Sequence, residues 1–467
     1  MIRQRIAFGI ACIVILSGCA GSHYYVLKNA ETVGPCQTTV PEHDLFLGVA
    51  LSGGGSRAAL FTEAGLEALA QVRMADGKSL ISRIDYLSSV SGGSLSASYY
   101  MLKKPGRDVP VLNADGTLSP AYRAFFDQYK AELSQDFETA LIWRQLLSFR
   151  WLNSALAAKT LAEILVEKLY GDARLQDLSA RAKAGDTPEI IINTTLYNNG
   201  RRLAMTTLPA EAFDYDFFAD LDRSLERRGM PIEPSPAIRE RWNRLRPMTP
   251  IEINMDPCPA SLAGAATASA SFAPLIGPIT FRIGDKEAYW HVGDGGLYEN
   301  SGIESLLFLF LKQLQAKRVK RALIVALDSS FPFSVGEQSL LKRSLPFSLL
   351  NFDFTRIPSI MEERALAYQA LFFRSLQLEG VFPDSKTVTV IALRHTDVKW
   401  AGDLSDLPAS CKAEGTLKTA QDVDDRVSAI PTRLGLTSAC DRDLIYAAAF
   451  KLVAQHKDAI LKFLNQP

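Results

Sequence analysis

Two apolar segments that each run straight into a turn of small residues restrict the fold of this chain more than any other feature. Residues 45–51 form the first segment, the glycines 53–55 follow, and residues 57–70 then have a helical composition. Residues 84–90 form the second segment, and residues 92–101 then have the composition of a closely packed helix. A strand, a tight turn and a helix, repeated in this way, predict an α/β fold with a parallel sheet.

Four later segments are also predicted to be strands. They lie at residues 189–194, 203–207, 321–327 and 387–393. The last two are continuous apolar runs, which are expected of strands that helices cover on both faces. We therefore expect three layers, with a mainly parallel central sheet flanked by helices.

The charges and the histidines argue against two classes of protein. The chain of 467 residues has 51 basic and 51 acidic side chains, so its formal net charge is zero. Nucleic-acid-binding proteins usually have a basic excess, so no nucleic-acid partner is expected. The five histidines have no metal-ligand spacing and no CxxC pair is present, so neither a metal nor another cofactor is expected.

The N-terminus has the order of features found in an export signal. Arg3 and Arg5 precede an apolar run at residues 6–16, which is shorter than the about 20 residues that span a bilayer. The run ends in Leu16-Ser17-Gly18-Cys19, which resembles a bacterial lipobox. This resemblance implies that Cys19 carries acyl chains, and Ala20 after it implies an outer-membrane anchor that faces the periplasm. The alternative is an ordinary secretory signal with an incidental cysteine.

Export changes the expected state of the cysteines. Cys12 lies in the signal and Cys19 in the lipobox, which leaves an even number for an oxidising compartment: Cys36, Cys258, Cys411 and Cys440. A bridge between the last two is favoured because the stretch between them is polar and contains glycine and proline, like a surface loop. The first two would then fasten the N-terminal segment. Four buried free thiols are the alternative.

The first turn, Ser52-Gly53-Gly54-Gly55-Ser56-Arg57, lies between a predicted strand and a predicted helix. Glycines let backbone N–H groups approach a ligand closely, and a helix N-terminus favours negative charge. Such a loop can bind a phosphate or a developing oxyanion. It is not a P-loop, because no Gly-Lys-Ser/Thr stands at the required offset. Taken alone, it is also compatible with a structural turn.

The second turn, Ser89-Val90-Ser91-Gly92-Gly93, has the strand–turn–helix context of a nucleophile elbow. The usual pattern is G-x-S-x-G, and here Ser89 stands in place of the first glycine. Serine is also small, so the turn is expected to survive. The alternative is a serine-rich helix cap.

The third motif, Gly293-Asp294-Gly295-Gly296, follows a predicted strand at residues 290–292 and places a carboxylate in a glycine turn. On its own it is equally compatible with a simple Asp-Gly turn. In this order, the three motifs resemble the patatin-like phospholipase family. A segment of small residues at 265–274, which ends in proline, is similar to one that the family has before its aspartate motif. The resemblance extends over roughly residues 45–330.

The resemblance implies a role for each motif. Ser91 would be the nucleophile, Asp294 its partner, and Gly53, Gly54, Gly55 and Arg57 the oxyanion hole, with Arg57 either bracing the loop or meeting a substrate phosphate. An unperturbed aspartate has a pKa near 3.9 and is a weak base. The pKa of Asp294 must therefore be raised by burial, or the carboxylate must act by orienting Ser91. Rival bases are His291, His395 and His456.

The same resemblance implies the organisation of the chain. We expect a signal at residues 1–18, a tether at 19–43, a patatin-like catalytic domain at 44–330, and a helical or loop extension at 331–467 that completes or caps the domain. The expected activity is that of a phospholipase A or lysophospholipase on membrane lipids. Transacylation with the same dyad, or lipid binding without catalysis, are the alternatives; no protein partner is predicted.

Two aromatic-rich stretches, at residues 137–169 and 331–373, could contact lipid. The first contains Trp143, Leu146 and Leu147. The alternative for both is a set of helices packed into the core.

Overall fold

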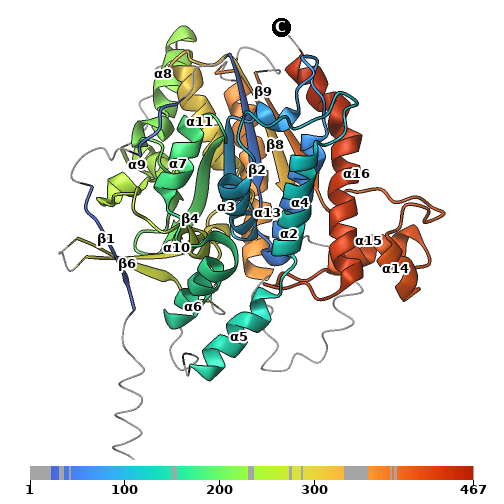
Figure 1. The fold of residues 1–467 in the computed structure, drawn as a ribbon. Coiled ribbons are helices and arrows are strands. Elements are labelled where there is room, and N and C mark those ends of the chain that lie inside the picture. The colour runs from blue at the N-terminus through green and yellow to red at the C-terminus, as the bar shows by residue number, and fades with distance from the viewer. Residues whose placement is uncertain are drawn as a thin grey trace, which may run out of the picture.

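A mixed sheet that takes strands from both ends of the chain forms the centre of the molecule (Figure 1). The computed structural model describes residues 23–30, 36–40, 44–148, 150, 155–229, 236–272, 276–284, 288–330, 356–378, 381–382 and 387–465. Within these residues the sheet has nine strands. They are β1 (Tyr25–Leu27), β2 (Leu45–Leu51), β3 (Tyr86–Val90), β4 (Glu189–Leu196), β5 (Arg201–Met205), β6 (Ile279–Ile283), β7 (Tyr289–Asp294), β8 (Arg321–Asp328) and β9 (Val388–Arg394).

The strand order brings the ends of β2, β3 and β7 together. The order is β1-β6-β7-β4-β3-β2-β8-β9, and β5 pairs with β4 off this path. The strands from β4 to β9 along this order are parallel, whereas β7 runs antiparallel to β4. The carboxyl ends of β2 and β3 therefore lie at one edge of the sheet, where ligands bind in open α/β folds.

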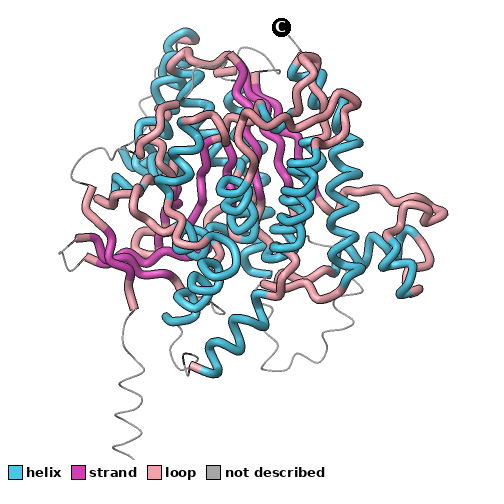
Figure 2. Tube along the Cα trace, viewed as in Figure 1, coloured by secondary structure: helices cyan, strands magenta, loops and turns pink. Residues whose placement is uncertain are grey.

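Helices cover both faces of the sheet (Figure 2). The described α-helices are α2 (Gly55–Ala70), α3 (Gly92–Lys103), α4 (Pro120–Leu133), α5 (Phe137–Leu147), α6 (Ala155–Leu165), α7 (Leu175–Lys183), α8 (Phe217–Arg227), α9 (Pro236–Leu245), α10 (Leu262–Ser269), α11 (Ile303–Gln315), α13 (Arg356–Leu378), α14 (Ala409–Glu414), α15 (Ala420–Ala429) and α16 (Ala439–Leu464). Short 3₁₀ or π turns lie at Leu80–Ser82, Val166–Tyr170, Ala210–Phe213, Pro250–Ile253 and Gly295–Leu297.

Successive side chains of a strand point to opposite faces of the sheet, so the hydrophobic core consists of two clusters. Leu47, Val49 and Leu51 of β2 pack with α2, α3, α10 and α16 on one face, and Phe46 and Ala50 pack with α11 and α13 on the other. Side chains that alternate between two buried faces are expected of a strand that helices cover on both sides. The predicted three-layer α/β fold is confirmed.

The structure adds two strands that the sequence did not indicate, β1 and β6. β1, within the expected tether, pairs in parallel with β6, so part of that segment belongs to the sheet. Both favoured disulfides are present, Cys36–Cys258 and Cys411–Cys440. The first of them attaches the N-terminal segment to the loop before α10.

The C-terminal extension contributes a strand and a long helix to the α/β unit. β9 pairs in parallel with β8 and extends the sheet, and α16 packs along α2. Part of the aromatic stretch at 331–373 lies outside the described residues. No helix in the described part of the chain combines the length and the apolar character needed to cross a bilayer.

Candidate active site

Ser91 occupies a strained turn between β3 and α3. Its backbone has φ 49° and ψ −120°, a conformation that non-glycine residues rarely adopt. Val90 ends the strand and Gly92 begins the helix, so the serine side chain projects at the helix N-terminus. This is the geometry expected of a nucleophile elbow.

Glycine at position 92 lets the elbow and the first turn touch through their backbones. A Cβ atom on Gly92 would lie 2.0 Å from the carbonyl oxygen of Gly55, and one on Gly93 would lie 2.6 Å from that of Ser52. Both distances are far below van der Waals contact. The small residues of this motif therefore serve close packing of two turns.

Asp294 lies at the end of β7 and reaches Ser91 across the end of β4. The hydroxyl of Ser91 donates a hydrogen bond of 2.9 Å to Oδ2 of Asp294, and the N–H of Gly296 donates one of 2.7 Å to Oδ1. Thr195 of β4 donates to the Asp294 carbonyl and holds the strand end in register. The antiparallel pairing of β4 and β7 thus brings together two residues 203 positions apart in the chain.

Burial changes the acid–base behaviour of Asp294. The side chain is almost fully buried, which raises its pKa to about 7, although the hydrogen bonds from Gly296 and Ser91 act in the opposite direction. Desolvation disfavours the charged form of a carboxyl group. A carboxylate with a pKa near neutrality is a far better proton acceptor than an ordinary aspartate.

The glycine turn lies directly beside Ser91. A Cβ atom on Gly53 would lie 3.1 Å from the Cβ of Ser91. The N–H of Gly53 donates to the carbonyl of Asn300. Gly54 and Gly55 both have positive φ; Gly54 is the N-cap of α2 and Gly55 is its first residue. The N–H groups at this helix N-terminus are suited to hold a negative oxygen.

Arg57 holds the glycine turn in place through hydrogen bonds of its side chain. The side chain is fully buried, and its guanidinium donates to the carbonyls of Ser329 and Ile430 and to the hydroxyl of Thr432. These contacts join the turn to the end of β8 and to the C-terminal extension. Of the two roles expected for Arg57, the structure favours bracing over contact with a substrate phosphate.

A buried polar network supports the elbow, and the sequence analysis did not assign it. The hydroxyl of Ser269 accepts a 2.9 Å hydrogen bond from the N–H of Ser91 and donates to the carbonyl of Asn193. The Asn193 amide in turn donates to the hydroxyl of Ser88 and the carbonyl of Ser89. Ser269 lies within the small-residue segment that supported the family resemblance, and Asn193 is a polar residue in a largely apolar strand, so the sequence carried a signal for both.

Serine at position 89, which departs from the usual glycine, is accommodated. Its buried hydroxyl donates to the carbonyl of Ile191 and accepts from the hydroxyl of Ser94. Burying a hydroxyl group costs little free energy when the group both donates and accepts a hydrogen bond.

The three rival histidines make contacts elsewhere. His291 pairs with Thr280 across β6 and β7, and His456 contacts the carbonyl of Leu452 within α16. His395 is fully buried against the ring of Phe61, and burial, with the nearby charge of Arg57, lowers its pKa well below the usual range. The acid–base group in contact with Ser91 is the Asp294 carboxylate.

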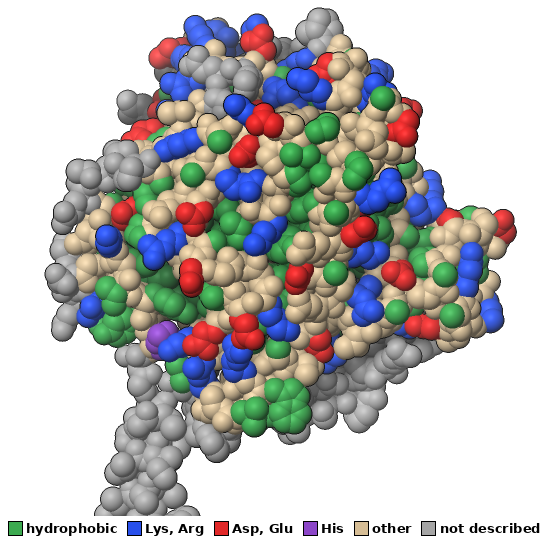
Figure 3. All heavy atoms as spheres, viewed as in Figure 1, with side chains coloured by type: hydrophobic (Ala, Val, Ile, Leu, Met, Phe, Trp, Pro, Cys, Tyr) green, Lys and Arg blue, Asp and Glu red, His purple; other side chains and the backbone are tan. Residues whose placement is uncertain are grey.

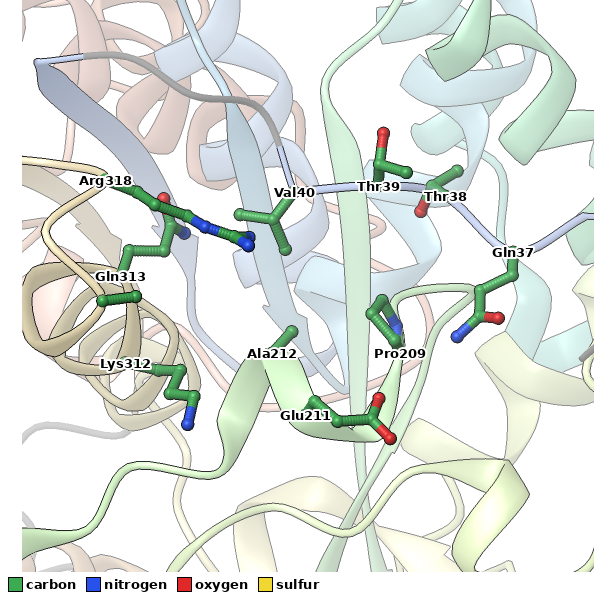
Figure 4. Close-up of a pocket in the computed structure, with 11 residues that line it drawn as sticks. Gln37, Thr38, Thr39, Val40, Pro209, Glu211, Ala212, Lys312, Gln313 and Arg318 are labelled. Atoms are coloured by element: carbon green, nitrogen blue, oxygen red, sulfur yellow. The ribbon is translucent and has the colours of Figure 1, made fainter.

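A pocket of about 650 Å³ lies at the opposite edge of the sheet (Figure 4). It is lined by residues that include Glu211, Lys312 and Gln313. The amide of Gln313 donates to the hydroxyl of Tyr86, the first residue of β3, whereas Ser91 follows the last residue of that strand. This pocket is therefore separate from the site around Ser91.

Comparison with known proteins identifies the family. The family model described as patatin-like phospholipase matches residues 49–307, which is more than half of the chain. The chain therefore belongs to the patatin-like phospholipase family, a family of lipid hydrolases. No curated protein sequence matches the chain.

The solved structures that are similar to this chain include the following two. Human GIVD cytosolic phospholipase A2 has 14% sequence identity and a TM-score of 0.45, and the alignment covers 91% of this chain and 60% of that one. VipD from Legionella pneumophila has 12% identity and a TM-score of 0.31, with 90% and 67% of the two chains covered. The present chain thus spans about 60% of the length of the human enzyme.

Proposed function

We propose that this protein is a lipid acyl hydrolase of the phospholipase A or lysophospholipase type, with Ser91 as the nucleophile and Asp294 as its base. The observation that carries the proposal is the 2.9 Å hydrogen bond from the Ser91 hydroxyl to a buried carboxylate whose pKa is about 7. The strained turn at Ser91 and the glycine turn beside it support the same assignment.

In the first half-reaction, the oxygen of Ser91 attacks the ester carbonyl and its proton passes to Asp294. The carbonyl oxygen becomes negative and accepts hydrogen bonds from the N–H groups of Gly54 and Gly55. The ester C–O bond then breaks, and the leaving alcohol takes the proton from Asp294. The acyl group remains on Ser91 as an ester.

In the second half-reaction, Asp294 takes a proton from water, and the oxygen of that water attacks the acyl carbon. The bond to Ser91 breaks, the serine recovers its proton, and a free fatty acid leaves. The network of Ser269 and Asn193 holds the elbow while these bonds change. Arg57 keeps the glycine turn in place through Ser329 and Ile430.

The proposed location is the bacterial cell envelope, with the protein anchored in the outer membrane through acyl chains on Cys19 and facing the periplasm. Cys19 lies outside the described residues. The two disulfides support an oxidising compartment, because such bonds are rare in reducing cytosol. Two or more acyl chains suffice for stable anchoring.

Mass spectrometry of envelope phospholipids incubated with the purified protein tests the proposal. Free fatty acid and lysophospholipid should accumulate with the wild type and not with Ser91→Ala. Ser410→Ala is a matched control, because Ser410 also donates a hydrogen bond of 2.7 Å to an aspartate, Asp443. Ser410 lies on α14 in the C-terminal extension, outside the site around Ser91. A new acylated acceptor without free fatty acid would indicate a transacylase, and unchanged lipids with folded wild type would indicate lipid binding alone.

A further inference from the structure

Helix α5 presents an apolar face that the rest of the described chain leaves exposed. Ile142, Trp143, Leu146 and Leu147 are 49%, 59%, 47% and 77% exposed. Their spacing places them on one side of the helix. The buried residues Phe137 and Leu141 fasten the other side to the core. Figure 3 shows hydrophobic side chains gathered at the bottom of the molecule, where Figure 1 places α5.

Two ion pairs lie beside this face. Arg144 on α5 pairs with Glu167, and Arg150 pairs with Glu163 at 2.6 Å. These two pairs add no net charge beside the face. A bilayer of either charge could therefore approach it without strong repulsion.

The start of α5 is linked to the glycine turn of the site through one segment of the C-terminal extension. The N–H of Phe137 donates to the carbonyl of Leu434, and Glu138 pairs with Arg433 at 3.6 Å. The carbonyl of Arg433 in turn accepts a 2.6 Å hydrogen bond from the N–H of Ser56. The exposed face and the proposed oxyanion hole thus belong to the same end of the molecule.

The N-terminal segment reaches the same end. α5 packs on α6, α6 packs on β6, and β6 pairs with β1, so these elements form one continuous side (Figure 1). His23, just before β1, lies within electrostatic reach of Lys159 and Glu163 on α6. Cys19 precedes His23 by four residues in the sequence, which an extended chain spans in about 14 Å.

We propose that the exposed face of α5 is a membrane-contact surface that inserts into the headgroup region of the bilayer that holds the Cys19 anchor. The inference rests on the proposed lipid hydrolysis and the proposed anchor, and it extends them. Tryptophan with large aliphatic residues on one side of a helix is the composition that binds at a membrane interface. Contact through α5 turns the Ser91 edge of the sheet toward that bilayer. The substrate is then drawn from the leaflet in which the protein is anchored.

A single fluorescent label tests the contact directly. Full-length protein is reconstituted in phosphatidylethanolamine–phosphatidylglycerol vesicles after an environment-sensitive dye is attached to Leu147→Cys. Lys320→Cys is the control, because the Lys320 side chain is also largely exposed but lies before β8, at the opposite edge of the sheet. We expect a blue shift and quenching by spin-labelled lipid only at position 147. Equal spectra at both positions, or a blue shift without vesicles that grows with protein concentration and so indicates a second copy, would overturn the proposal.

A second experiment separates membrane contact from catalysis. In Trp143→Ser/Leu147→Ser, hydrolysis of vesicle phospholipid should fall at least tenfold while hydrolysis of a soluble short-chain ester stays at the wild-type rate. Equal activity of variant and wild type on vesicles would refute the membrane contact and leave the proposed hydrolase intact. Absence of soluble-ester hydrolysis in the wild type would instead refute the proposed function, and the dye measurement would still decide the membrane contact.

Discussion

Asp294 combines two properties that an aspartate at a surface lacks, burial and a direct hydrogen bond to a serine hydroxyl. Burial raises its pKa to about 7, and this shift makes a dyad without histidine chemically reasonable. The sequence predicted either a pKa raised by burial or a carboxylate that orients Ser91, and it did not show what would bury Asp294. The cause is the enclosure of the β7 end by segments far away in the chain, which no local pattern records.

The pH dependence of hydrolysis follows from that pKa. Asp294 must be deprotonated to accept the Ser91 proton, so kcat/KM on a soluble ester should rise about tenfold per pH unit below pH 7 and level off above it. The measurement is a pH–rate profile between pH 5 and 9 in one ionic strength. An aspartate with its ordinary pKa near 3.9 would instead give a constant rate over this range.

Removing the charge of Asp294 should stabilise the fold while it stops catalysis. Because the pKa is higher in the folded state than in the unfolded state, stability decreases as pH rises from about 4 to about 7, and the full cost is present above pH 7. Asp294→Asn should therefore melt a few degrees higher than the wild type at pH 8, with little difference at pH 4. Differential scanning calorimetry at both pH values checks this. A lower Tm for the variant at pH 8 would contradict the pKa assignment.

At the scale of elements, the packing of two turns decides whether the site forms. Gly92→Ala would place a Cβ 2.0 Å from the Gly55 carbonyl and must push α2 and α3 apart at their N-termini. We expect soluble-ester hydrolysis to fall at least about 100-fold, since a shift of about 1 Å can cost that much. The control is Gly402→Ala, where no heavy atom lies within 4 Å of the added methyl group. Equal activity of the two variants would show that the contact between the turns is unimportant.

The elements themselves were predictable to different degrees. β2 was predicted at its observed bounds, and β8 and β9 within one residue, because continuous apolar runs are strong signals. β5 begins and ends two residues earlier than predicted, because the two arginines at its start are not typical of a buried strand. β1 was missed because three residues in a polar stretch carry no periodicity and form a strand only through β6.

The sequence predicted the main residues of the candidate site but not the contacts that hold them in position. The motifs indicated Ser91, Asp294 and the glycine turn, and the structure brings these together. The orientation of Arg57 depends on carbonyls at positions 329 and 430, and the amide of Gly53 is engaged by Asn300. Contacts between residues hundreds of positions apart leave no local pattern, so these roles emerged only from the fold.

At the scale of the whole molecule, the disulfide Cys36–Cys258 holds the N-terminal segment to the α/β unit across 222 residues. Replacing both cysteines with alanine should lower the free energy of unfolding by about 2–5 kcal/mol, because the bridge restricts the unfolded chain. The same change at Cys411 and Cys440, which are 29 residues apart, should cost less. Urea denaturation of both variants measures the difference. A larger loss at the shorter bridge would show that strain or local packing outweighs chain entropy.

The proposed lipid hydrolase activity and the proposed membrane contact through α5 are consistent with one orientation of the whole molecule. The apolar face of α5 and the Ser91 edge of the sheet belong to one end, and the pocket beside Gln313 lies at the other. The proposed anchor on Cys19 would hold the first of these ends at the membrane. An enzyme built in this way would act on the membrane that holds it.

The most direct test of the central claim is peptide mass spectrometry after treatment with a lipid-like fluorophosphonate. The account predicts one adduct on the peptide that carries Ser91 in the wild type, none in Ser91→Ala, and strongly slowed labelling in Asp294→Asn. Folded wild-type protein that takes up no probe, or an Asp294→Asn variant that is labelled at the wild-type rate, would contradict it.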